Sequence, residues 1–381
     1  MAAPNTWAGT LNFNEVLTSC KNMIISQRVF SDMINTSAYR TPVNRNRVEG
    51  TLYGDTKLYY STDILHVEDF ALDTVNQLNL LAISRPKDPF CQAIVLDQFK
   101  FIQVTLDEYF TKRAFSTASV FSDYHGVMLS WLQKTQEIYD ETTYNAYLGT
   151  VETSEGNQQQ EVDITGITAV STTIDEEAKN RLIAEKVGEK LQNIMTELKD
   201  VSSDWNDLGY TRKDDPSEFD IYWNAKYANF LRSVALPSLF HKDGIVKIEE
   251  ENILPARYFG EVNASSGTTS ASNTTVRFLQ ATKVGEGDNA VYYKAGDLCP
   301  NSYSYAAGKT YTENSGLLTD GAVICKIVHK GAIPYMSGYK TQKEFINVKN
   351  LSTNHYLHFS HNTLQYLYNY PLITVKLNSS N

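Results

Sequence analysis

The sequence is poor in cysteine, with four in 381 residues, at Cys20, Cys91, Cys299 and Cys325. No two of them have the C-x-x-C spacing of a zinc knuckle or a redox motif, and so few cannot make a disulfide scaffold. The chain also lacks an apolar run of about 18 residues, the length that spans a membrane. Residues 1–7 do not have the basic-then-apolar pattern of a secretory signal. We therefore expect a protein made and assembled in a cytosol, with no membrane partner.

Positive charge is also scarce, because 34 Lys and Arg stand against 44 Asp and Glu, a formal net charge of -10. This balance argues against a protein that wraps DNA or RNA with a basic surface. It remains compatible with a container that holds nucleic acid without gripping it. Tyrosine, by contrast, is plentiful, with 24 residues. Tyr has a large apolar ring and a polar tip, which suits subunit contacts or, alternatively, the edges of a β-rich core.

Motifs that would indicate an enzyme or a cofactor are incomplete. Gly308-Lys309-Thr310 resembles the end of a phosphate-binding loop, but Tyr303 stands where that loop needs its first glycine. His355, His358 and His361 recur every three residues, a spacing that on a helix can bring two ligands to one metal. The region has the composition of a strand, on which this spacing alternates between faces. We predict no catalytic residue, no cofactor and no metal site.

The first third of the chain is predicted to be mostly extended. Residues 1–48 have little periodicity and are typical of an arm that is ordered only by another chain. Residues 49–103 contain strand-like segments, a turn at Gly54-Asp55 and a loop with two prolines at 85–89. A long two-stranded excursion cannot bury both of its faces, so we expect it to need a neighbour.

Two helices and a β-rich remainder are predicted next. Apolar side chains at helical spacing indicate a helix over 119–148, about 45 Å long, with Gly149 as its C-terminal glycine. A second helix is expected over 173–200, opened by a capping box of Thr173 with Glu176. Residues 205–260 indicate short strands with a helix near 217–232. The Ser- and Thr-rich residues 261–321 indicate an exposed β-rich insertion, and strands follow at 322–328 and within 345–377.

Four segments carry a resemblance to a known family: 104–115 (VTLDEYFTKRAF), 138–146 (IYDETTYNA), 220–227 (DIYWNAKY) and 236–244 (LPSLFHKDG). With the order of parts around them, they resemble the Hong Kong 97-type major capsid fold of tailed phages. The resemblance is greatest to the major capsid proteins of small podoviruses of Gram-positive bacteria. It covers roughly residues 50–260 and 322–377, and it consists of a pattern of segments rather than a catalytic signature.

The resemblance implies an α+β fold divided as in that family. The expected parts are an N-terminal arm (1–48), an extended loop (49–103), a peripheral domain (104–172 and 322–381) with a spine helix at 119–148, and an axial domain (173–321) with the β-rich insertion at 261–321.

The resemblance also implies a function. The expected protein is no enzyme but self-assembles into pentamers and hexamers of an icosahedral shell in the virion, after synthesis in the host bacterial cytoplasm. Its expected partners are itself, a scaffolding protein, a portal and packaged double-stranded DNA. Two alternatives remain open at this point: the shell of an encapsulin-type nanocompartment, and a β-rich protein that binds or hydrolyses glycans.

Candidate contacts between subunits are Arg45, Arg47, Tyr53, Lys57 and Tyr59. The two arginines could pair with acidic clusters of another subunit, at 214–215 or 249–251, although such clusters more often form a solvated surface. Lys57 is expected near the tip of the extended loop. Some relatives cross-link a lysine of this loop to an asparagine, but a solvated lysine is the simpler interpretation, and no cross-link is predicted.

Overall fold

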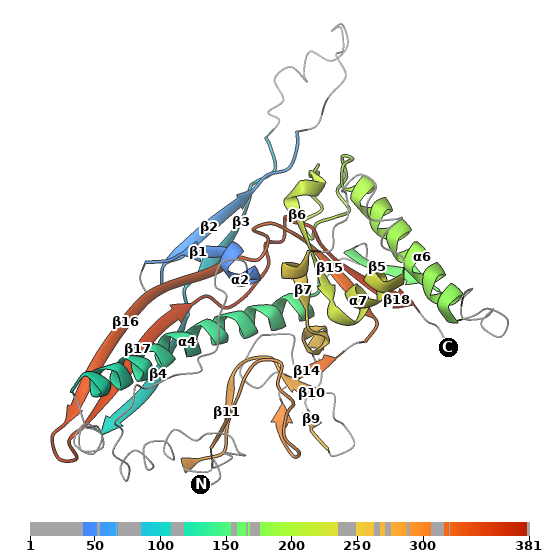
Figure 1. Ribbon diagram of the computed structural model, residues 1–381. Coiled ribbons are helices and arrows are strands. Elements are labelled where there is room, and N and C mark those ends of the chain that lie inside the picture. Colours follow the sequence, from blue (N-terminus) through green and yellow to red (C-terminus); the bar gives the residue numbers. More distant parts are fainter. Residues whose placement is uncertain are drawn as a thin grey trace, which may run out of the picture.

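A long helix, α4 (Ala118–Thr150), runs diagonally through the computed structural model and connects its two larger sheets (Figure 1). No helix among the described residues is long and apolar enough to cross a membrane. The structure describes residues 41–51, 54–65, 67, 85–107, 118–153, 158–164, 167, 176–234, 249–262, 267–270, 276–287, 290–305, 316–319 and 321–378.

A four-stranded sheet lies along the first part of α4. Its order is β1-β16-β17-β4, with β1 parallel to β16 and the other pairs antiparallel. Helix α4 lies against β4 and β17, and the side of β17 that carries Leu357 and Phe359 is buried. The strands are β1 (Arg47–Glu49), β4 (Gln98–Asp107), β16 (Tyr335–Asn347) and β17 (Ser352–His361).

A five-stranded sheet lies at the other end of α4, in the order β5-β18-β15-β6-β7. Apolar side chains of α6 (Glu176–Glu197) and α7 (Ala225–Val234) pack against one face of it. Tyr144 and Leu148 of α4 pack against the other face, where Tyr222 and Val328 lie. The strands are β5 (Gln159–Asp163), β6 (Phe219–Asn224), β7 (Ile253–Leu254), β15 (Val323–His329) and β18 (Leu372–Asn378).

A two-stranded ribbon and a group of small sheets project from this body (Figure 1). The ribbon consists of β2 (Thr56–Ser61) and β3 (Phe90–Val95), paired antiparallel. The small sheets have the orders β10-β14-β8, β11-β12 and β13-β9. Their strands are β8 (Gly260–Val262), β9 (Gly267–Thr268), β10 (Val276–Phe278), β11 (Thr282–Val284), β12 (Val291–Tyr293), β13 (Ser304–Tyr305) and β14 (Gly316–Thr319). The remaining short elements are α2 (Pro42–Arg45), η3 (Pro216–Glu218), η4 (Glu250–Asn252) and η5 (Ala256–Tyr258).

The two long helices agree with the sequence analysis, but the helix expected near 217–232 was placed wrongly. Residues 219–224 form β6 instead, a strand that is buried along its whole length. The side chain of Asp215 caps η3 just before it, and Asn224 Oδ1 accepts a hydrogen bond from the backbone N–H of Lys226. The first of these hydrogen bonds lies at the start of η3 and the second at the start of α7, so the helix begins only at Ala225.

Two further expectations differ from the structure. The end of the predicted arm belongs to the body, because Val43 is buried beneath α4 and β1 pairs with β16. Residues 1–40 lie outside the described residues, as does Thr173 of the expected capping box. Residues 104–172 and 322–381, expected in one domain, are divided, since β5, β15 and β18 enter the five-stranded sheet whereas β4, β16 and β17 enter the four-stranded one. Sheet membership depends on long-range pairing, which no local pattern specifies.

Candidate assembly surfaces

The β2–β3 ribbon exposes one apolar face. Side chains alternate along each strand, so one face carries Thr56, Leu58, Tyr60, Cys91, Ala93 and Val95, and none of these is charged. Leu58 is 52% exposed and Tyr60 is 67% exposed. Contiguous apolar surface of this kind marks an interaction site on a soluble protein.

The opposite face anchors the base of the ribbon to its own chain. Ile94 and Leu96 are fully buried in a cluster with Met336 and Leu367. Gln92 Nε2 donates to the carbonyl of Tyr366, and its Oε1 accepts from the N–H of Tyr368. These contacts fix the direction in which the ribbon projects from the body.

Three predicted contact residues belong to this region. Tyr59 lies on the anchored face, where burial raises the pKa of its phenol. Lys57 was expected near the loop tip, which is wrong: it lies at the base, paired in register with Ile94 and 3.9 Å from Asp55. The turn at Gly54-Asp55 joins the ribbon to the body instead of forming its tip, because Gly54 and Asp55 exchange backbone hydrogen bonds with Leu96. Tyr53 lies outside the described residues.

The two predicted arginines have partners within one chain. Arg45 Nη1 lies 3.3 Å from Asp220 Oδ2, and a second nitrogen donates to Asn252. Arg47 Nη2 lies 3.1 Å from Asp140 Oδ2 of α4. Contacts of either arginine with another subunit therefore stay a prediction.

The four-stranded sheet has an aromatic outer face, on the side away from α4. Phe99 and Phe101 of β4 are exposed, and their rings contact those of Tyr339, Tyr356 and His358 at centroid separations of 5.6–6.2 Å. This patch is not among the predicted contacts, although the alternation of Phe99 and Phe101 around Lys100 indicates it in the sequence.

The histidines of β17 alternate as the sequence predicted. His355 and His361 are buried on the α4 side, and His358 faces outward. Gly308 of the incomplete phosphate-loop motif lies outside the described residues, and so does the family-like segment 236–244.

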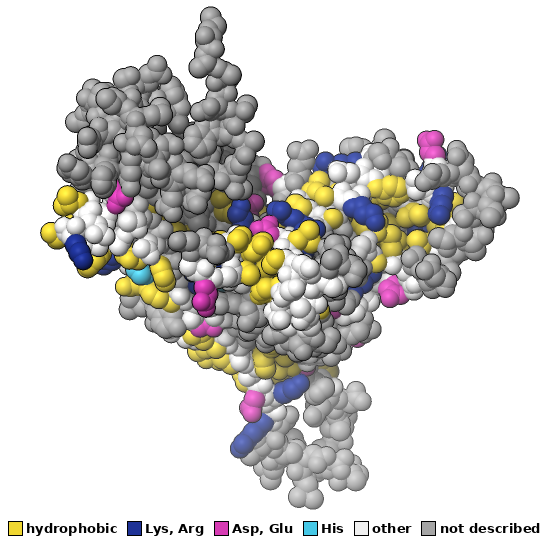
Figure 2. Space-filling model, turned by 90° about the horizontal axis from the view of Figure 1, so that it is seen from below, with side chains coloured by type: hydrophobic (Ala, Val, Ile, Leu, Met, Phe, Trp, Pro, Cys, Tyr) yellow, Lys and Arg dark blue, Asp and Glu magenta, His cyan; other side chains and the backbone are white. Residues whose placement is uncertain are grey.

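The tip of the β16–β17 hairpin is also apolar. Phe345, Ile346, Val348 and Leu351 are each more than half exposed. Figure 2, seen from below, shows hydrophobic side chains at the end of the molecule where this hairpin lies. Ribbon, aromatic face and tip together leave more apolar surface uncovered than scattered surface residues would.

One acidic cluster is only partly the solvated surface that its composition suggested, because Asp215 is exposed and Asp214 is not. Asp214 is buried, and its carboxylate accepts hydrogen bonds from Arg212 Nε at 3.2 Å and Nη2 at 2.5 Å. Asp215 accepts from the backbone N–H of Ser217, which lowers the pKa of its carboxyl.

Comparisons with known proteins agree with a shell-forming role. A family model described as Phi29-like phage major capsid protein matches residues 2–371. A chain in the capsid structure of Staphylococcus phage Andhra superposes with a TM-score of 0.61 at 13% identity, covering 92% of this chain and 88% of that one. A chain in the structure of the head fiber and inner core protein of native bacteriophage P68 gives 0.56 at 12% identity, with coverages of 98% and 92%. No curated protein matches the sequence. At these identities the structural likeness shows the fold, a mixed helix-and-sheet fold found in phage capsids.

Proposed function

Because the chain belongs to the family of Phi29-like phage major capsid proteins, we propose that it forms pentamers and hexamers of an icosahedral shell around double-stranded DNA. The family makes it a structural protein of the virion capsid rather than an enzyme, and its principal partners are copies of itself. This replaces the alternatives of a nanocompartment shell and a glycan-acting protein.

The observation that carries the proposal is the uncharged outer face of the β2–β3 ribbon, with Leu58 and Tyr60 more than half exposed. An isolated two-stranded hairpin is marginally stable in water, and apolar side chains gain free energy when a neighbour covers them. Closed rings of subunits need two different complementary surfaces on each copy. A projecting ribbon at one side and apolar sheet surface at another meet that requirement.

The described elements support an assignment to the Hong Kong 97-type fold. In this assignment α4 is the spine helix, the β2–β3 ribbon is the extended loop, and the four-stranded sheet is the core of the peripheral domain. The five-stranded sheet with α6 and α7 is the axial domain, and the small sheets formed by β8 to β14, at 260–319, correspond to its insertion. The same proposal includes a relationship to the capsid proteins of podoviruses of Gram-positive bacteria. It also includes a scaffolding protein and a portal as partners, and synthesis in the host cytoplasm.

Net charge fits the enclosed DNA. At a formal charge of -10 the subunit repels phosphate on average, so an incoming duplex would not be trapped on the wall. The shell would hold DNA by enclosing it.

Expression of the full chain, with and without a candidate scaffolding protein, tests the proposal. Sedimentation and negative-stain microscopy should reveal uniform shells or rings of five and six subunits. A chain that stays a single copy at high concentration under both conditions would overturn it.

A further inference from the structure

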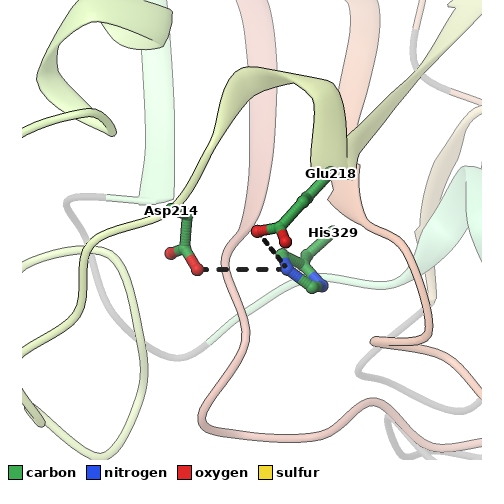
Figure 3. Close-up of side chains that lie close together, drawn as sticks. All are labelled: Asp214, Glu218 and His329. Atoms are coloured by element: carbon green, nitrogen blue, oxygen red, sulfur yellow. Dashed lines mark ion pairs between the residues drawn. The ribbon is translucent and has the colours of Figure 1, made fainter.

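Three side chains outside the assembly surfaces converge at the junction of the two sheets. Asp214 and Glu218 come from the segment that leads into β6, and His329 is the last residue of β15. One ligand atom from each lies within 4.8 Å of the others. Figure 3 shows both carboxylates directed at the same ring nitrogen of His329.

The histidine ring is held in one orientation. Its Nδ1 lies 2.7 Å from the carbonyl oxygen of Lys330, so this nitrogen carries the proton and donates it. The ring packs against Phe219 and Tyr370, at centroid distances of 5.4 and 4.6 Å. In the neutral ring, Nε2 therefore presents a lone pair toward the carboxylates. A backbone carbonyl that orients a histidine in this way is a usual feature around metal ligands.

A lone pair that faces two carboxylates makes a group that can hold a cation. Nε2 lies 3.6 Å from Glu218 Oε2 and 3.9 Å from Asp214 Oδ1, too far for hydrogen bonds. A proton on Nε2 would draw a carboxylate to about 2.8 Å. Ligand atoms around a tetrahedral zinc ion lie about 3.3 Å apart, given bonds of about 2.0–2.2 Å. The observed spacings are closer to the second arrangement. A small movement of the half-exposed Glu218 side chain, whose Oε2 also accepts a hydrogen bond from the N–H of Asp215 at 3.4 Å, would close the difference.

We propose that Asp214, Glu218 and His329 bind a divalent ion of the zinc class. One imidazole nitrogen and two carboxylate oxygens make three protein ligands, and water would complete the tetrahedron. No metal site is predicted from the sequence, because residues 214 and 218 are separated from residue 329 by more than a hundred positions and no short motif joins them.

The surroundings favour an ion that bonds to imidazole over one held by charge alone. Arg212 offsets one carboxylate charge while it fixes Asp214 in place, as outer partners of ligating carboxylates do. Beside the cluster is an open pocket of about 780 Å³, which gives an ion and its water a path from solvent. Lys199 and Lys213 also line this pocket and oppose any divalent ion alike. The imidazole ligand therefore makes the difference, and Mg²⁺, which prefers oxygen ligands, should bind more weakly than Zn²⁺.

A bound ion would join two segments that already touch. The N–H of Lys330 donates to the carbonyl of Glu218, and Lys330 Nζ donates to that of Ser217. The chain then turns through Gly331, at φ 79°, toward β16 of the other sheet. An ion at His329 would thus stabilise the connection from one sheet to the other, since a ligand that binds only the folded state raises its stability.

The test uses the full chain, stripped with a chelator and titrated with Zn²⁺ or Mg²⁺ by calorimetry and thermal unfolding. We expect a Zn²⁺ site that raises the melting temperature and that Mg²⁺ does not reproduce. His329→Gln and Glu218→Gln should each weaken Zn²⁺ binding by at least about tenfold. His358→Gln, which removes a histidine from the aromatic outer face, is the matched control and should bind like the wild type.

Equal Zn²⁺ binding in the wild type and in both ligand variants would overturn the proposal, because the ion would then sit elsewhere. Stability that follows pH at His329 but ignores Zn²⁺ and chelator would also overturn it, in favour of a proton between the same groups. Shell formation, measured on the same samples, reports separately on the proposed function.

Discussion

Lys326 connects the end of α4 to the middle of the five-stranded sheet. It lies on β15 with none of its surface exposed, and its Nζ donates to the carbonyl of Val151, just beyond the helix. Carbonyls at a helix C-terminus have no partner within the helix, and a cation is favourable there. In the sequence this lysine interrupts an apolar strand, but in the structure it supplies a hydrogen-bond donor to a carbonyl at the end of α4.

Lys326→Met should therefore lower the free energy of unfolding by about 1–3 kcal/mol, because it leaves a buried carbonyl without its donor. Urea unfolding of dissociated subunits measures the change. Lys343→Met, on the exposed part of β16, is the control and should shift stability by no more than about 0.5 kcal/mol. Equal effects at the two positions would contradict the assigned role of the Val151 bond.

A second buried group joins α4 to the four-stranded sheet. Asp140 of α4 accepts a hydrogen bond from the Tyr335 hydroxyl at 2.6 Å and pairs with Arg47. His361 stacks on the Tyr335 ring, and its Nε2 lies 2.9 Å from the hydroxyl of Tyr139. Burial raises the pKa of Tyr335 and lowers that of His361 below its ordinary 6.5. The folded state therefore favours neutral His361.

This shift predicts a pH dependence of stability. The unfolded chain takes up a proton at His361 near pH 6.5, whereas the folded chain resists it until a lower pH. The stabilisation is therefore complete above pH 6.5 and is lost as pH falls below it. Urea unfolding between neutral pH and about pH 5 should show this loss, and His361→Gln should reduce it. His358→Gln should leave the loss unchanged, and the same reduction in both variants would contradict burial as the cause.

At the scale of elements, Gly149 decides how closely α4 approaches η5. Its position in the sequence predicts a helix-ending glycine, but α4 continues to Thr150. A Cβ at position 149 would lie 2.0 Å from the carbonyl oxygen of Tyr258. Glycine stands there because two backbones touch, which the sequence around it does not reveal.

Gly149→Ala should destabilise the subunit by about 1–3 kcal/mol, since backbone must move to admit the methyl group. Gly126→Ala provides a control in the same helix, because nothing lies within 4 Å of its added Cβ. Helix propensity alone predicts that Gly126→Ala stabilises by about 0.5–1 kcal/mol. Thermal unfolding of the two variants should therefore move in opposite directions, and two shifts of the same sign would contradict the close approach.

Sequence patterns predicted elements better than the contacts between them. The apolar spacing over 119–148 gave the long helix because side chains at helical spacing, such as Met128, Leu132 and Leu148, are buried on one side of it. The FDIYWN segment of β6 was ambiguous, since six consecutive buried residues show neither period. Burial of Asp214 depends on Arg212 and on distant His329, which no local rule relates. The alternation of side chains along β2 places Leu58 and Tyr60 on the face opposite Tyr59. Only the buried cluster around Ile94 and Met336 shows which of the two faces is exposed to water.

At the scale of the molecule, exposed apolar surface is concentrated on parts that project from the body. The two largest hydrophobic cores lie on the two faces of the five-stranded sheet. The ribbon and the β16–β17 hairpin extend away from these cores (Figure 1). Their exposed side chains therefore add little to the stability of one copy. Substitution there should separate folding from assembly, whereas substitution in the cores would impair both.

The double substitution Leu58→Ser with Tyr60→Ser is expected to abolish shells while leaving the subunit folded. Both side chains lie on the uncharged outer face of the ribbon, so their removal costs contact area between copies rather than core packing. Sedimentation measures assembly, and circular dichroism and thermal unfolding of the unassembled chain measure folding. Thr56→Ala, on the same face, removes only a hydroxyl and is the control.

Cys91 supplies an independent readout of the same contact, because its thiol is exposed on that face between Ala93 and the ribbon tip. Maleimide should label Cys91 quickly in dissociated subunits and slowly in shells, and a Cys91→Ser variant gives the contribution of the other cysteines. Shells that form at normal yield from the double variant, with Cys91 as reactive as in free subunits, would show that this face points to solvent in the capsid. The aromatic face around Phe99 and Phe101 would then be the surface that joins the copies.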